Sequence, residues 1–183
     1  MSKFEDLTSY SYFGYFEGIK NVGWLDGEFP QASASKEFID KLKVYGEQKF
    51  IVRRTRGWHS CPYCPAGKKP ASSTSEIRVV GEKGEVYASP FMIIHYMEAH
   101  DYCPPQEFWE AVMHGPEPGS EKYKAAIKNA EKTYDATKAE EIRTRRNKES
   151  WDKLEADMVG QIAKDIDSHI IKEIQKNNER KIK

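Results

Sequence analysis

The distribution of proline and glycine divides this chain into two parts that cannot fold in the same way. All nine prolines and eleven of the twelve glycines lie in residues 1–119, with nineteen of the 22 aromatic residues. Residues 120–183 contain no proline, and 29 of these 64 side chains are charged. Because proline interrupts helices and clustered proline and glycine form turns, the pattern predicts a turn-rich globular part followed by a long, charged helical part. The predicted fold class is α+β.

The joint between the parts is the segment Gly-Pro-Glu-Pro-Gly at 115–119. We therefore predict a globular domain over residues 1–115, a Pro/Gly joint over 116–119 and a helical tail over 120–183. In the globular part, Ser35 is placed to cap a helix that ends near Gly46, and Phe50-Ile51-Val52 is typical of a short strand.

Positive and negative charges balance over the whole chain. There are 29 Lys+Arg and 29 Asp+Glu residues, and residues 1–119 carry −3 against +3 for residues 120–183. This balance excludes a strongly basic nucleic-acid coat or a strongly acidic tail as the function of the whole molecule. Neither an apolar run of membrane-spanning length nor a signal-peptide pattern occurs, so we expect a cytoplasmic protein.

A Cys-x-x-Cys pair, Cys61 and Cys64, carries the clearest chemical signal. Two cysteines at this spacing can present both sulfurs to one tetrahedral metal ion. Downstream, two β-rich runs at 76–80 and 85–88 flank Gly-Glu-Lys-Gly and predict a hairpin. Ser89-Pro90 then predicts a helix start, with Ser89 as the N-cap, and the helix is expected to run to His100. The expected module is a knuckle followed by a zinc-finger-like ββα unit.

That predicted helix supplies two histidines, His95 and His100, within the spacing of structural zinc sites. The predicted Zn²⁺ ligands are Cys61, Cys64, His95 and His100, with His59 and Cys103 as alternates. Five residues on an ideal helix leave two side chains about 140° apart, so we expect His100 in a frayed or tightened last turn. A redox dithiol is the main alternative for the cysteines, but such a motif normally opens a helix, whereas Pro65 to Pro70 follow here.

The order of these motifs resembles a family of small uncharacterised bacterial proteins. The resemblance covers about residues 20–115 and rests on these segments: Gly23-Trp24-Leu25, Arg56-Gly57-Trp58-His59-x-Cys61-x-x-Cys64, Glu76-Ile77-Arg78-Val79-x-Gly81, Tyr87-Ala88-x-Pro90, Ile94-His95-Tyr96, His100-x-Tyr102-x-Pro104-Pro105 and Glu107-Phe108. It implies a fold and a metal site. The family's His-x-Cys-x-x-Cys and His-Tyr-x-x-x-His elements match His59, Cys61, Cys64, His95 and His100, and Cys103 lies outside that pattern. It implies no activity.

The tail is expected to form one or two helices, the first capped by Ser120. Its strongest apolar stripe recurs every three or four residues. The stripe consists of Trp151, Leu154, Met158, Ile162, Ile166, Ile170 and Ile174, flanked by Val159, Ala163 and Ile171. A helix this long must cover the stripe by folding back on residues 1–115, by self-association or by binding a partner. Residues 158–171 also resemble a helix of tailed-phage head and capsid proteins, which implies a virion or assembly role.

Three function classes follow from these features. The first is a non-enzymatic structural or interaction protein, in which zinc holds the globular module and the tail binds a partner or another copy. The second is nucleic-acid binding through three groups of basic residues: Arg53, Arg54 and Arg56; Lys68 and Lys69; and Arg143, Arg145 and Arg146. The third is a zinc hydrolase with His59 or Glu98 as a base. The sequence shows no second carboxylate and no phosphate-binding loop at a spacing typical of such an active site. The first is favoured, so no catalytic residue is assigned.

Overall fold

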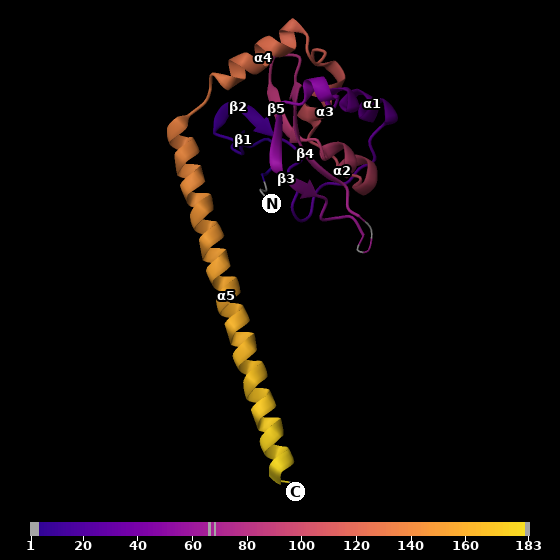
Figure 1. The fold of residues 1–183 in the computed structure, drawn as a ribbon. Helices are drawn as coiled ribbons and strands as arrows, with labels where there is room; N and C mark the ends of the chain where they lie inside the picture. The colour runs from indigo at the N-terminus through magenta and orange to yellow at the C-terminus, as the bar shows by residue number, and fades with distance from the viewer. Residues whose placement is uncertain (1–3, 66, 68, 182–183) are drawn as a thin grey trace. The chain divides into compact units, whose positions relative to one another are not determined.

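The structure is a computed structural model that describes residues 4–65, 67 and 69–181, without the side chains of Arg56, Ala163 and residues 165–181. It contains strands and helices in mixed order, which confirms the α+β class (Figure 1). The strands are β1 Ser9–Tyr10, β2 Phe16–Asn21, β3 Arg53–Ser60, β4 Ser72–Val80 and β5 Val86–Pro90. The helices are α1 Lys36–Tyr45, the 3-10 turn η1 Gln48–Phe50, α2 Ile93–His100, α3 Gln106–His114, α4 Glu121–Glu131 and α5 Ala136–Lys181.

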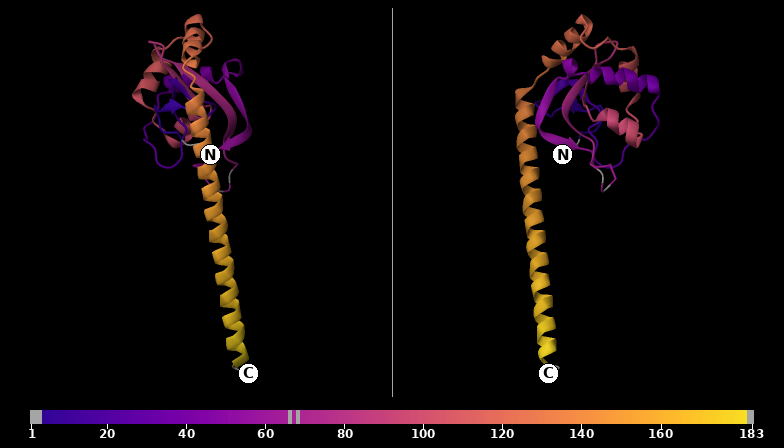
Figure 2. Two further views of the ribbon diagram at one scale, coloured as in Figure 1. Left: turned by 90° about the vertical axis from the view of Figure 1, so that its left-hand side faces the viewer. Right: turned by 45° about the vertical axis from the view of Figure 1, so that its right-hand side comes forward.

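The strands form one mixed sheet in the order β1-β2-β5-β4-β3. β4 and β5 form the predicted hairpin, in which Val80 pairs with Val86. β2 runs parallel to β5 although more than 60 residues separate them, and β3 pairs with β4 at one end of the strand order. The curled sheet can be followed from two further sides in Figure 2.

Helices and aromatic side chains close the core around this sheet. The ring of Phe38 in α1 stacks on Trp109 of α3, with ring centroids 5.9 Å apart, and Phe108 of α3 packs edge-on against Tyr87 of β5. The aromatic N-terminal segment also belongs to the core, because Phe4 and Tyr12 both pack against Trp24.

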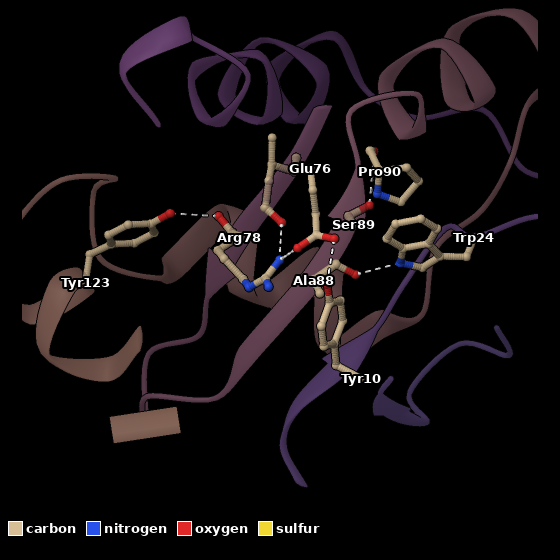
Figure 3. Close-up of polar contacts among 9 residues, drawn as sticks. Tyr10, Trp24, Glu76, Arg78, Ala88, Ser89, Pro90 and Tyr123 are labelled. Carbon is tan, nitrogen blue, oxygen red and sulfur yellow. Dashed lines mark hydrogen bonds and ion pairs between the residues drawn. The ribbon is translucent and has the colours of Figure 1, made fainter. Parts of the chain in front are cut away.

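A buried polar chain crosses the centre of the sheet (Figure 3). Glu76 and Arg78, both 3% exposed, form an ion pair on β4. The hydroxyl of Tyr10 donates to Glu76 Oε2 at 2.8 Å, and the guanidinium of Arg78 lies 4.8 Å from the Tyr10 ring centroid. The hydroxyl of Tyr123 in α4 donates to the carbonyl of Arg78 at 3.0 Å. Each charge therefore has a partner, as buried charges require.

Two predicted element boundaries are wrong. The Ser89-Pro90 pair does not cap α2, because both residues extend β5: Ser89 pairs with Ile77 and Pro90 with Glu76. Cross-strand pairing outweighs the local capping signal, so α2 begins only at Ile93. The predicted strand at 50–52 is also absent among the described residues, since Phe50 ends the 3-10 turn and β3 starts at Arg53. By contrast, Ser35 caps α1 by accepting a hydrogen bond from the Phe38 N–H, as predicted.

The chain divides into two compact units, residues 1–136 and 137–183. α4 therefore belongs to the first unit, where it contacts β2, β4 and β5, and Ser120 caps it as predicted. The second unit consists of nearly all of α5. Trp151, Leu154, Met158, Val159 and Ile162 of the predicted stripe are exposed there, whereas the side chains of Ala163, Ile166, Ile170, Ile171 and Ile174 lie outside the described set. None of the described helices is long and apolar enough to cross a membrane.

Candidate metal centre

The loop that joins β3 to β4 places the two cysteines of the knuckle. Cys61 directly follows β3, and its N–H donates to the carbonyl of Ala71 at 2.8 Å, which closes the loop at its base. Tyr63 anchors the turn, because its hydroxyl donates to the carbonyl of Gly27 and its ring packs against Phe29. Cys61 is 5% exposed and Cys64 is half-buried. These contacts tie the knuckle to the base of its loop and to the segment that contains Gly27 and Phe29.

α2 places the two histidines, and its C-terminal end explains how both face the knuckle. The N–H groups of Asp101 and Tyr102 both donate to the carbonyl of Tyr96, five and six residues back, so the last turn is wider than an ordinary α-helical turn. Asp101 then adopts a left-handed conformation with φ 54°. The expected frayed or tightened turn is therefore wrong: a widened turn brings the rings of His95 and His100 to 5.0 Å.

A second segment of chain holds this helix end in place. The side chain of Gln31 donates to the carbonyl of His100 at 3.2 Å, and the Ala32 N–H donates to the carbonyl of Asp101 at 2.8 Å. The hydroxyl of Tyr102 donates to Asp6 Oδ2 at 2.6 Å. Burial raises the pKa of Asp6, and the bond from Tyr102 opposes that rise. The position of His100 therefore depends on contacts with the N-terminal segment as well as on α2.

The structure brings Cys61, Cys64, His95 and His100 together. Each residue offers one sulfur or nitrogen atom, and these four atoms all lie within 4.8 Å of one another. His100 Nε2 lies 3.2 Å from Cys61 Sγ and 3.9 Å from Cys64 Sγ, and His95 Nε2 lies 3.4 Å from Cys64 Sγ. Around one tetrahedral zinc ion, sulfur and nitrogen ligands stand about 3.6 Å apart. The four residues are positioned to hold a metal ion, and their spacing fits a tetrahedral one.

Burial favours the uncharged forms of Cys61 and His95. Burial raises the pKa of the Cys61 thiol and lowers the pKa of His95, whose neighbour His100 lowers it further. A neutral imidazole is the form that coordinates a metal, and a thiol must lose its proton to do so. A cation at the centre would supply the charge that stabilises the thiolate.

Both alternate ligands lie outside the cluster. His59 Nε2 lies 2.7 Å from the hydroxyl of Tyr96, and burial lowers the pKa of His59. The Cys103 thiol faces the carbonyl of Pro104 at 3.8 Å. One contact near the site had no signal in the sequence, namely the packing of the Tyr63 ring on His100 at 5.8 Å. Tyr63 lies between the two cysteines and so belongs to the knuckle as a packing residue.

Comparison with known proteins gives a family and no activity. Neither a curated protein nor a solved structure matches the chain. A family model does match residues 2–113, which include all four clustered residues and every strand of the sheet. The chain belongs to the family described as a domain of unknown function, DUF7919.

Proposed function

We propose that residues 1–136 form a zinc-stabilised structural module without enzymatic activity. The observation that carries the proposal is the convergence of two cysteine sulfurs and two histidine nitrogens from separate segments within 4.8 Å. Two thiolates and two imidazoles in tetrahedral spacing are a donor set that zinc prefers. The ion would tie the loop after β3 to the end of α2.

The donor count favours a structural ion over a catalytic one. Catalytic zinc sites use three protein ligands and keep the fourth position for water, whereas four ligands fill the tetrahedron. The two side chains considered as bases are engaged elsewhere: His59 with Tyr96, and Glu98 with Lys43, whose Nζ donates to Glu98 Oε1 at 2.6 Å. Zinc in such modules contributes an apparent folding free energy of about 10–16 kcal/mol, so its role here is stability.

Metal analysis and one cysteine variant test this proposal. Elemental analysis of the purified chain should give one zinc per molecule. Cys61→Ser should lose that zinc and abolish cooperative melting of residues 50–105, while circular dichroism still reports the helix of α5. Cys103→Ser is the matched control, since its thiol lies outside the cluster, and it should keep both zinc and melting temperature. Absence of zinc, or an unchanged melting temperature in Cys61→Ser, would refute the proposal.

The tail completes the proposed function as a self-association helix. Among the described side chains of α5, the apolar ones at 151, 154, 158, 159 and 162 are 48–69% exposed. Acidic and basic residues are interspersed along the same helix, and Arg143 pairs with Glu140 within it. A helix with charges of both signs interspersed around an apolar stripe is suited to pair with a second copy of itself.

Analytical ultracentrifugation of the full chain tests the tail. The mass should rise with protein concentration toward that of a dimer. The triple variant Leu154→Ser, Met158→Ser and Ile162→Ser should stay monomeric, whereas Lys153→Ser, Asp157→Ser and Gln161→Ser, which change neighbouring non-stripe positions, should still associate. A monomer at all concentrations, or equal effects of the two variants, would contradict this part of the proposal.

The proposal also includes the class of protein. The resemblance of residues 20–115 to small bacterial zinc-binding proteins supports the zinc assignment. The resemblance of residues 158–171 to helices of tailed-phage head proteins supports an assembly role for the tail, in the cytoplasm or in a virion.

A further inference from the structure

Basic residues are concentrated in one stretch of the chain. Residues 48–75 contain six Lys or Arg residues and no Asp or Glu, although the chain as a whole is neutral. This stretch runs from η1 through β3 and the following loop into the start of β4, and it ends just before the buried Glu76. The net charge of zero therefore conceals a strongly positive segment.

β3 presents this segment at an open edge of the sheet. It is the terminal strand in the sheet order and pairs only with β4 among the described strands (Figure 1). Its ladder is interrupted, because the four residues between Arg54 and His59 stand opposite a single residue of β4, Thr74. The side chain of Thr55 accommodates the bulge by donating to the carbonyl of Gly57 at 2.6 Å. Residues 55–58 are thus displaced from the regular ladder.

The bulge exposes an aromatic ring on the strand that also carries Arg53 and Arg54. Trp58 is 73% exposed, the most exposed large hydrophobic side chain among the described residues. Arg54 is exposed as well, and Arg53 lies 5.3 Å from the ring centroid of Phe13, which is itself 41% exposed. Within the described part of the chain, no carboxylate forms an ion pair with Arg53 or Arg54. Both guanidinium groups are available to an external anion.

We propose that this β3 edge surface, Phe13, Arg53, Arg54 and Trp58, binds single-stranded nucleic acid. Because Arg53 and Arg54 are consecutive in β3 and face opposite sides of the strand, they would contact phosphates from the two sides of this edge, and Trp58 would stack on a base. Cationic grooves combined with exposed aromatic rings are the features that proteins use to bind single strands. An exposed indole can stack only on a base whose face is free, which disfavours a duplex. The inference uses none of the four cluster residues and goes beyond the structural role proposed above.

Fluorescence anisotropy of the full zinc-loaded chain with labelled 15-nucleotide oligo(dT) and oligo(U) tests the proposal. Affinity should fall steeply between about 50 and 200 mM salt, because each phosphate contact on a single strand contributes roughly 0.7 to the log–log slope. Arg54→Ala should reduce that slope by roughly 0.7. Trp58→Ala should weaken binding about fivefold or more with little change in slope, and Trp58→Phe should restore most of it.

The tail offers matched controls. Trp151→Ala removes an indole that is 69% exposed, and Arg143→Ala removes an arginine that is 70% exposed. Neither should change affinity for the oligonucleotides. Zinc content and melting temperature of every variant are measured alongside, so loss of the metal is distinguished from loss of the surface.

Four results would overturn the proposal. The first is that the chain does not bind the oligonucleotides at the lower salt concentration, and the second is that it binds a duplex of the same length more tightly. The third is that Trp151→Ala and Arg143→Ala lose as much affinity as the variants of the surface. The fourth is that the chain fails to bind oligonucleotides while Trp58→Ala impairs its binding to phosphatidylserine vesicles. The last result would assign the surface to anionic membranes instead.

Discussion

His59 and Tyr96 are joined by a 2.7 Å contact between Nε2 of the imidazole and the phenol hydroxyl. Tyr96 is fully buried and lies on α2 beside His95. The contact connects β3 directly to the helix that carries both histidines of the cluster. His59 therefore contacts the helix that carries two residues of the Cys/His cluster and is not itself a member of that cluster.

The first prediction separates these two roles. His59→Ala should keep one zinc per molecule and lose about 1–3 kcal/mol of unfolding free energy, because the buried Tyr96 hydroxyl is left unpaired. His100→Ala should lose the zinc. Elemental analysis and urea titration of the two variants measure both effects, and a zinc-free His59→Ala protein would place His59 among the ligands.

The second prediction concerns the buried ion pair. Tyr10→Phe removes the hydroxyl that donates to Glu76 and should cost about 1–3 kcal/mol, since a buried carboxylate loses a donor. Tyr134→Phe changes a tyrosine that is 52% exposed and should cost much less. Urea-induced unfolding of both variants provides the measurement. Equal costs would show that the Tyr10 hydroxyl contributes nothing to the stability of the pair.

The third prediction is a loss of stability in alkali. Burial raises the pKa of Tyr123 from 10.0 to about 12. Between these values the unfolded chain loses the proton while the folded chain keeps it, so the unfolding free energy should fall with rising pH from about 10 to 12. The slope for one such group approaches about 1.4 kcal/mol per pH unit. Tyr123→Phe should make the measured decline shallower, and an identical decline would contradict this assignment.

The fourth prediction compares two glycines. A Cβ added at Gly115 would collide with the carbonyl oxygens of Val80 and Ala111, so Gly115→Ala should destabilise the module by about 1–3 kcal/mol. A Cβ at Gly160 would meet nothing within 4 Å, and Gly160→Ala should stabilise α5 by about 0.5–1 kcal/mol. Thermal melts followed by circular dichroism report both. Effects of the same sign would show that close backbone approach does not explain the glycine at 115.

Local signals in the sequence predicted the parts of the fold that depend on neighbouring residues. Ser35 and Ser120 cap α1 and α4 as expected, and the turn at 81–84 joins the expected hairpin. The parallel pairing of β2 with β5 could not be predicted, because it joins residues such as Ile19 and Val86 that have no local relationship. β3 also lacks a period-two apolar pattern, since its alternation is replaced by arginines and a bulge.

One missed element had a readable signal. α3 follows Pro105 and buries Phe108, Ala111 and Val112, which recur at helical spacing. For the candidate site, the four clustered residues were predictable from ligand spacing. The widened turn at Tyr96 was not, because it depends on contacts made by Gln31, Ala32 and Asp6, all far away in the sequence.

The ion pair between Glu76 and Arg78 has a consequence for errors in strand pairing. Successive residues of a strand face opposite sides, so a one-residue slip of β4 would turn both charges away from Tyr10 and toward the side where Tyr87 packs on Phe108. Two charges placed there would be buried without partners, which is strongly unfavourable. Two charged residues at the centre of the sheet thus select a single alignment of β4, where an all-apolar strand would tolerate several.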